Sequence, residues 1–168
     1  MRIRKMVITD VARYRDLRLQ ALADSPTAFG SSVDEQREHD LETYIQRIPA
    51  PDSDNATFVA ESADQRLTGM IGFSRSPRVK MRHKGSIWSV YVEPAARGKG
   101  VSRALMDATI AHARQLEGLR LVVLNVVVTN FPAIRLYESY GFEIWGTEPE
   151  ALYVDGRYYD EHYMTLRL

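Results

Sequence analysis

A short loop rich in glycine and positive charge, Arg97-Gly98-Lys99-Gly100, carries the clearest chemical signal in this sequence. It follows a β-branched and aromatic stretch that stops at Pro94, a residue that cannot donate to a sheet ladder. After the loop, apolar residues recur from Val101 to Ala111 at the spacing of one helix face. The N–H groups of such a loop and the N-terminus of the following helix favour an anion. The pattern therefore predicts a site for a phosphorylated ligand.

Two common nucleotide-binding patterns do not fit this loop. The segment from Gly98 to Arg103 lacks the third glycine of a dinucleotide fingerprint, and no acidic residue follows at the required distance. The GxxxxGK[ST] spacing of a P-loop is also absent. On these residues alone, an anion-binding loop of another kind and a plain turn both remain open.

A second motif lies downstream, from Asn130 to Phe142, where Asn130 is a good helix cap and Pro132 suits a first turn. With the strand end Val92-Glu93-Pro94 and the loop, this segment resembles the GNAT superfamily of acetyl-CoA-dependent N-acetyltransferases. The family patterns are V-x-P, [QR]-x-x-G-x-[GA] and N-x-x-A-x-x-L-Y-x-x-x-G-F, and they occur here in the same order and spacing. The resemblance is clear over residues 55–145, and the order of elements extends it over the whole chain.

The resemblance implies that acetyl-CoA is the acetyl donor. Backbone groups of Tyr91 and Val92 are then expected to meet the pantetheine arm and the acetyl carbonyl. The other expected cofactor-binding residues are Arg97, Gly98, Lys99, Gly100, Val101, Ser102, Asn130 and Tyr137. Ser102 stands where the family usually has glycine or alanine. Serine is small, and its hydroxyl can hydrogen-bond a phosphate oxygen.

The resemblance also implies a general acid at Tyr137, which would protonate the departing thiolate; a thiol pKa near 8.5 makes that proton useful. The alternative for Tyr137 is a core aromatic, and for Asn130 a helix cap alone. A base must deprotonate the incoming amine, and Glu93 beside the strand end is the first candidate. The alternative for Glu93 is an exposed loop carboxylate without a catalytic role. Further candidates are Glu35, Glu38 and His39. The sequence does not assign the base among them.

Composition limits the other functions that this chain could have. Lysine plus arginine equals aspartate plus glutamate at 22 each, so no net field recruits nucleic acid or a membrane. Cysteine is absent and the four histidines are scattered, so no metal site is expected. The N-terminus lacks a signal-peptide core and no apolar run is long enough to span a membrane, which favours a cytoplasmic protein.

Two charged stretches stand apart from these motifs. A basic run between two predicted strands could contact the 3′-phosphate of coenzyme A or simply keep a hairpin loop soluble; it comprises Arg75, Arg78, Lys80, Arg82 and Lys84. The acidic stretch 34–42 could attract a cationic amine or form a solvated helix face.

The apolar patterns define the elements that must position these residues. Strands are predicted at 2–8, 57–61, 67–73, 85–92, 119–128, 142–147 and 158–166. Helices are predicted after Asp10, from the capping box Ser32–Glu35, over 98–116 and from Asn130 to Tyr140. The fold class is α+β (mixed α/β): a single domain over 1–168, with a twisted mixed sheet of about six to seven strands flanked by about four helices. The aliphatic run 119–128 suits a central strand buried on both faces.

The expected function is transfer of an acetyl group from acetyl-CoA to a primary amine of a small molecule or peptide, by direct attack in a ternary complex. A small molecule is favoured because nothing extended and charged suggests a peptide groove. The alternative is a non-catalytic acyl-CoA-binding or sensing module with the same fold. Asp155-Gly156 predicts a tight turn between two strands of the C-terminal segment 154–164. Tyrosines and acids of this segment could line the acceptor pocket, contact a second copy in a homodimer, or belong to a half-exposed strand.

Overall fold

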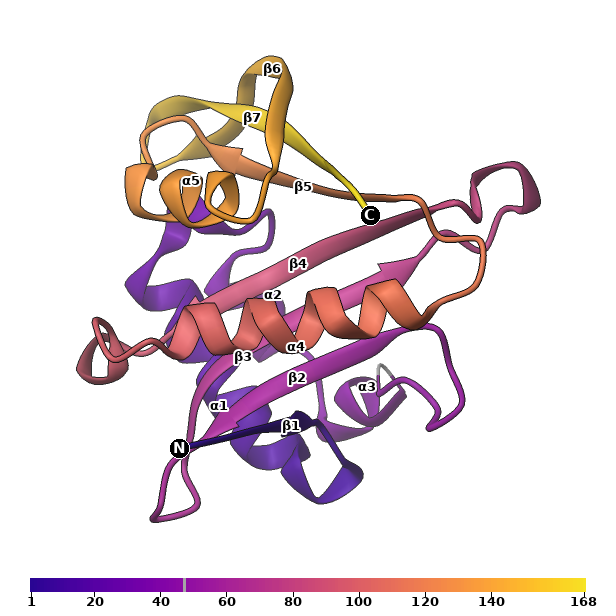
Figure 1. Ribbon diagram of the computed structural model, residues 1–168. Coiled ribbons are helices and arrows are strands. Elements are labelled where there is room, and N and C mark those ends of the chain that lie inside the picture. The colour runs from indigo at the N-terminus through magenta and orange to yellow at the C-terminus, as the bar shows by residue number, and fades with distance from the viewer. Residues whose placement is uncertain (47) are drawn as a thin grey trace.

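One sheet of seven strands organises the molecule, in a computed structural model that describes residues 1–46 and 48–168 (Figure 1). The strand order is β1-β2-β3-β4-β5-β7-β6. Strands β4 and β5 run parallel, and every other neighbouring pair is antiparallel. The strands are β1 (Arg2–Lys5), β2 (Ala56–Glu61), β3 (Leu67–Arg75), β4 (Lys84–Val92), β5 (Leu121–Val127), β6 (Glu143–Val154) and β7 (Arg157–Arg167).

The described residues form five α-helices, one more than the sequence predicted. They are α1 (Val11–Asp24), α2 (Val33–Arg37), α3 (Leu41–Gln46), α4 (Val101–Gln115) and α5 (Phe131–Glu138). The predicted capping box is confirmed, because Ser32 and Glu35 exchange side-chain to backbone hydrogen bonds. The helix that it opens is short. Asp40 begins a separate helix by accepting the N–H of Thr43 at 2.8 Å, which is the action of an N-cap.

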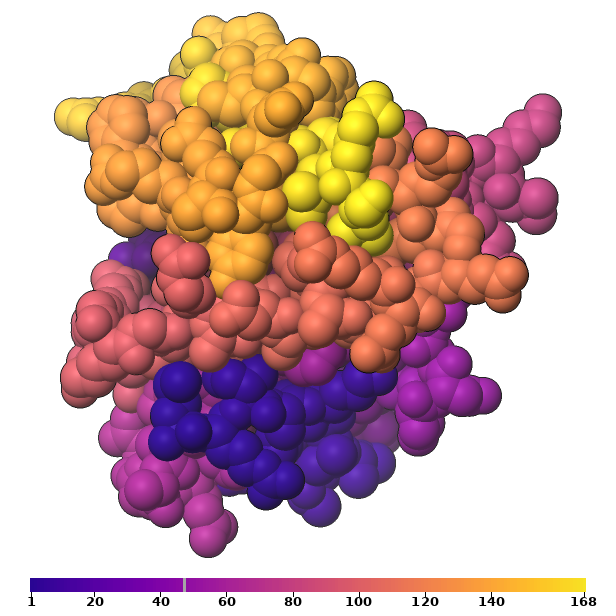
Figure 2. Space-filling view, in the orientation of Figure 1, coloured from indigo at the N-terminus to yellow at the C-terminus, as the bar shows by residue number. Residues whose placement is uncertain are grey.

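The helices cover the two faces of the sheet (Figure 1). Because side chains alternate along a strand, Phe58 of β2 packs under α4 with Leu105, while its neighbour Val59 packs with α1. Helix α5 joins the α4 side of the core through Ile134. In the space-filling view the orange and yellow C-terminal segments stand above α4, and the indigo N-terminal segment lies below it (Figure 2).

Strands β4 and β5 separate after a short common ladder. Their pairing runs only from Lys84↔Leu121 to Ser86↔Val123. Farther along β4, a bulge places two residues opposite Ile71 of β3, and Ser89 there adopts a left-handed φ of +54°. Beyond Ser86, therefore, the facing edges of β4 and β5 are not paired with each other.

The C-terminal hairpin is longer than predicted. Strand β6 continues to Val154, beyond the expected end at residue 147, with register shifts at two places along its ladder with β7. The predicted Asp-Gly turn is confirmed, since Asp155 and Gly156 both have positive φ, +49° and +79°. This backbone conformation suits a two-residue hairpin turn.

Candidate active site

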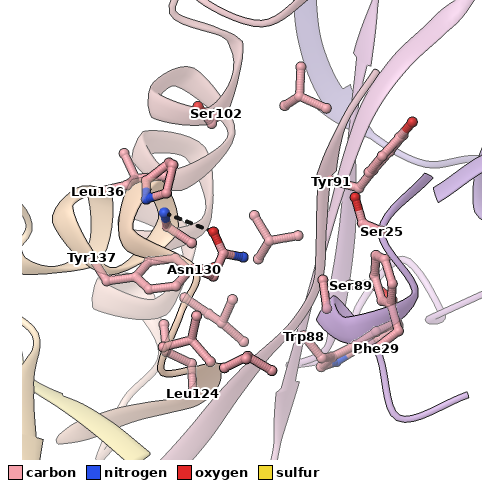
Figure 3. A pocket seen from close by; sticks show the side chains of 18 of the residues that line it. Ser25, Phe29, Trp88, Ser89, Tyr91, Ser102, Leu124, Asn130, Leu136 and Tyr137 are labelled. Carbon is pink, nitrogen blue, oxygen red and sulfur yellow. Dashed lines mark hydrogen bonds between the residues drawn. The ribbon is translucent and has the colours of Figure 1, made fainter. Parts of the chain in front are cut away.

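The main cavity, which we call cavity 1, lies where β4 and β5 separate and has a volume of about 820 Å³. Its walls come from β4, β5, the start of α4, helix α5 and the segment after α1. Figure 3 shows Asn130 and Tyr137 on one side and Trp88, Ser89 and Phe29 on the other. Chain segments far apart in the sequence therefore meet at one site.

Most of the predicted site residues line cavity 1. They are Tyr91, Val92, Arg97, Gly98, Val101, Ser102, Asn130 and Tyr137. Lys99 and Gly100 belong to the same loop without lining the cavity, and Glu93 does not line it either. The glycine loop and the segment that begins at Asn130 are separate in the sequence, and both border cavity 1.

Tyr137 is 5% exposed and packs beside Phe142, with ring centroids 6.0 Å apart. Burial raises the pKa of its hydroxyl above the ordinary tyrosine value, because the phenolate loses solvation. No described residue hydrogen-bonds this hydroxyl, although its side chain lines cavity 1. The Tyr137 ring therefore packs in the core while the residue borders cavity 1, and its role as a general acid stays a prediction.

The glycine loop lies at the start of α4. Gly98 and Gly100 have φ of +74° and +78°, so the left-handed backbone explains the residue type. Gly100 is the N-cap of α4, and no side chain caps the first turn. The first N–H groups of the helix lie beside the cavity wall formed by Val101, Ser102 and Arg103. This arrangement can bind an anion through backbone donors and the helix dipole.

Asn130 begins α5 by accepting the N–H of Ala133 at 3.3 Å, as the dashed line in Figure 3 shows. This confirms the predicted cap, and the residue also lines cavity 1.

The side chains of Tyr91 and Arg97 both have hydrogen-bond partners within the protein. The Tyr91 hydroxyl donates to Asp24 at 2.5 Å, and in Figure 3 its ring points away from the cavity. Burial and the Asp24 carboxylate raise the pKa of that hydroxyl. Arg97 donates from Nε to the Val92 carbonyl at 2.9 Å. Tyr91 therefore lines cavity 1 while its hydroxyl is engaged elsewhere, and the contact of its backbone with a cofactor stays a prediction.

The candidate carboxylates differ in their partners and in whether they line the cavity. Glu93 is buried, and Arg66 donates from Nη2 to both of its carboxylate oxygens at 3.0 Å. Glu161 of β7, which the sequence did not single out, lines cavity 1 and accepts a hydrogen bond from Asn125. Among the described residues that line this cavity, Glu161 is the one carboxylate. Glu35, Glu38 and His39 line neither this cavity nor its neighbour.

A smaller cavity of about 320 Å³, which we call cavity 2, adjoins the first. Arg18, Trp88 and Ser89 line both cavities. Arg18 was not among the predicted site residues, although the sequence holds a signal for it. Arg18 lies four residues from both Tyr14 and Leu22, on the apolar face of α1.

The basic run lies outside both cavities. None of the basic residues from Arg75 to Lys84 lines either cavity, and Arg75 and Arg82 pair with Asp54. Among the described residues, no group of three or more acidic, histidine or cysteine side chains is arranged to hold a metal ion. Within the same residues, no helix combines the length and apolar character needed to cross a bilayer.

This site and this fold can be compared with known proteins. The model of the acetyltransferase (GNAT) family matches residues 19–142, so the chain belongs to that family. The structure of yncA from Salmonella typhimurium with its cofactor acetyl-CoA is similar over 100% of this chain and 94% of that one, with 27% identity and a TM-score of 0.81.

Two curated relatives match part of the chain. Spermidine N(1)-acetyltransferase of Vibrio cholerae is 30% identical over 109 residues, covering 64% of this chain and 61% of that protein. Streptothricin acetyltransferase of Streptomyces lavendulae is 36% identical over 117 residues, covering 68% and 59%. In both cases the matched part of this chain spans less than two thirds of the relative.

Proposed function

We propose that this protein transfers the acetyl group of acetyl-CoA to a primary amine of a small molecule, by direct attack in a ternary complex. The observation that carries this proposal is the shared cavity, which a separated strand edge, an anion-binding helix start and a buried tyrosine all border. Membership of the acetyltransferase family supports the same class of reaction.

In this proposal acetyl-CoA binds along the open edge of β4. The pantetheine arm meets backbone groups near Tyr91 and Val92, as an added strand would. The pyrophosphate lies against the loop from Arg97 to Ser102, where the N–H groups and the dipole of α4 neutralise its charge. Asn130 contacts the cofactor from the start of α5, on the opposite wall.

The chemistry balances with residues of this cavity. The amine nitrogen attacks the thioester carbon, and the tetrahedral intermediate collapses by breaking the C–S bond. Tyr137 donates its proton to the thiolate of coenzyme A. Before this attack, one proton of the ammonium group passes to a carboxylate, directly or through water, and leaves the neutral amine. The proton that the nitrogen loses as the amide forms returns to the Tyr137 oxygen.

For that carboxylate we favour Glu161 over Glu93. Asn125 holds one oxygen of Glu161, and the residue lines the cavity in which the amine must lose its proton. Glu93 is paired with Arg66 and does not line cavity 1, so Glu93 is the weaker candidate for the base. The two are separated by mutation, as described in the Discussion.

The names of relatives favour a small acceptor, because spermidine and streptothricin are small amines. The non-catalytic acyl-CoA-binding module remains the second candidate, and it predicts cofactor binding without turnover. A homodimer also stays a prediction from the sequence, which analytical ultracentrifugation tests.

The first experiment is a thermal shift measurement with acetyl-CoA, followed by an assay of free thiol release over a panel of amines. We expect acetyl-CoA to raise Tm and at least one amine to accelerate thiol release. Cofactor binding with no turnover on any amine would favour the sensing module, and an unchanged Tm would count against both.

A further inference from the structure

We propose that the acceptor is a small amino acid-like compound, whose carboxylate is bound by Arg18 and whose uncharged side group occupies cavity 2. This inference rests on the proposed function, because it names the class of amine that the same site accepts.

Arg18 stands at the junction of the two cavities and is held in place from two sides. Its Nη1 donates to Ser89 Oγ at 2.8 Å. Its guanidinium carbon lies 4.5 Å from the centre of the Phe29 ring, where a cation is stabilised by the aromatic face. A guanidinium fixed in this way presents a planar set of donors, which matches the two oxygens of a carboxylate.

The formal charge that borders cavity 2 is positive. Among the described residues that line cavity 2, Arg18 carries the one formal charge. A polyamine would place a second ammonium group in a space where no lining carboxylate compensates it. An acceptor with a carboxylate instead brings the opposite charge.

The position of Arg18 also limits the distance between the carboxylate and the amine. Arg18 is bonded to Ser89, which lies in the bulge of β4, next to the open edge proposed to bind the thioester. An amine that attacks there while its carboxylate contacts Arg18 must carry the two groups close together. An α-amino acid, with its amine and carboxylate on one carbon, satisfies this requirement.

Cavity 2 offers a place for the rest of such a molecule. Apart from Arg18, the described residues that line it are neutral and combine apolar and aromatic side chains with a few polar groups: Met6, Tyr14, Ser31, Gln36, Tyr44, Ile48, Thr57, Trp88 and Ser89. Its volume of about 320 Å³ suits a small side group. Neutral walls favour an uncharged group over an ionised one.

The test compares amino acids with their carboxamides, which keep the amine and the side chain but lack the negative charge. The probes are L-methionine, L-phenylalanine and L-leucine, each with its amide, and spermidine, assayed by thiol release from acetyl-CoA. We expect kcat/KM for at least one amino acid to exceed that of its amide at least about tenfold, as lost pairing of a buried polar group implies.

In Arg18→Gln we expect that ratio to fall toward one, chiefly through a higher KM for the amino acid. Arg18→Lys keeps the charge without the planar set of donors, and its ratio should lie between those of the wild type and Arg18→Gln. Arg114→Gln is the matched control, because Arg114 is exposed on α4 and lines neither cavity. It should leave the ratio unchanged.

The outcomes separate the two levels of the argument. Equal or better use of the amides, preference for spermidine, or no use of any amino acid by a protein that binds acetyl-CoA overturns the inference. An Arg18→Gln protein that folds and keeps the ratio overturns it too. The wild-type ratio decides even if this variant does not fold. A protein whose Tm is insensitive to acetyl-CoA fails the proposed function itself.

Discussion

In the proposed mechanism, Tyr137 serves both packing and chemistry. Its ring is buried beside Phe142, and the residue borders cavity 1. The same burial raises the pKa of the hydroxyl, which keeps the proton on oxygen through the alkaline range in which amines are good nucleophiles. A proton donor that stays protonated is the form that the proposed mechanism needs.

Replacing Tyr137 with phenylalanine should lower kcat at least about tenfold, because only the proton donor is removed. Acetyl-CoA binding should persist, since the ring still packs in the same place. The checks are steady-state kinetics and the acetyl-CoA thermal shift. In the wild-type protein, kcat should show no loss from tyrosine ionisation below about pH 10. Unchanged kcat in the variant would contradict the proposed role.

A pair of carboxylate variants tests the base. Glu161→Gln should reduce kcat/KM for the amine at least about tenfold at neutral pH, with partial recovery at high pH, where more of the amine is already unprotonated. Glu93→Gln should reduce kcat/KM much less, because Glu93 is paired with Arg66 and does not line cavity 1. The reverse order in pH–rate profiles would assign the base to Glu93.

At the scale of elements, the site depends on two local irregularities. The bulge at Ser89 accompanies the separation of β4 from β5, and the left-handed glycines shape the loop at the start of α4. Each turns backbone groups away from regular pairing, which is where a ligand can use them.

Gly100→Ala tests the loop. An added Cβ at Gly100 meets no atom within 4 Å, so the cost comes from the positive φ alone, about 1–2 kcal/mol. We expect that cost to be relieved by a shifted loop, with a higher Kd for acetyl-CoA. Gly118→Ala is the control, because Gly118 has a φ of +72°, follows α4 at its other end and lines neither cavity. Isothermal titration should give equal affinities for wild type and Gly118→Ala; equal losses in both variants would reject a local role for the loop.

At the scale of the whole molecule, a charged cluster joins the N-terminal segment to the sheet. Asp10 is fully buried and accepts hydrogen bonds from Arg4, Arg13 and the N–H of Val7. Arg4 and Arg13 also pair with Glu61 of β2. The cluster therefore links β1, the start of α1 and β2, on the opposite side of the sheet order from the C-terminal hairpin.

Asp10→Asn should lower the free energy of unfolding by about 3 kcal/mol or more at neutral pH, as removal of one partner from a buried ion pair does. The Arg4 guanidinium lowers the pKa of Asp10 in the folded state, so its contribution is present above the unfolded value near pH 4 and is lost at lower pH. The difference between wild type and variant should therefore shrink below about pH 4, measured by urea denaturation. Asp34→Asn, at an exposed pair with Arg37, is the control and should change stability by less than about 0.5 kcal/mol. A constant difference across this pH range would contradict the assignment.

Features that depend on neighbouring residues could be predicted from the sequence. The capping box at Ser32, the cap at Asn130 and the Asp155–Gly156 turn are local hydrogen-bond and backbone preferences, and the structure confirms them. The family motifs likewise revealed the class of protein, because loop and strand-end residues lie close in the chain.

Which distant residues line the cavity follows only from the tertiary structure. Arg18, Trp88 and Glu161 come from three distant elements, and only the sheet order and the separation of β4 from β5 bring them to one space. The same long-range packing brings Arg66 next to Glu93, to which it donates a hydrogen bond. A pattern along the chain records which face a residue occupies and not which distant residue it meets. The sequence therefore predicted the glycine loop beside cavity 1 but not Arg18 or Glu161 on its other walls.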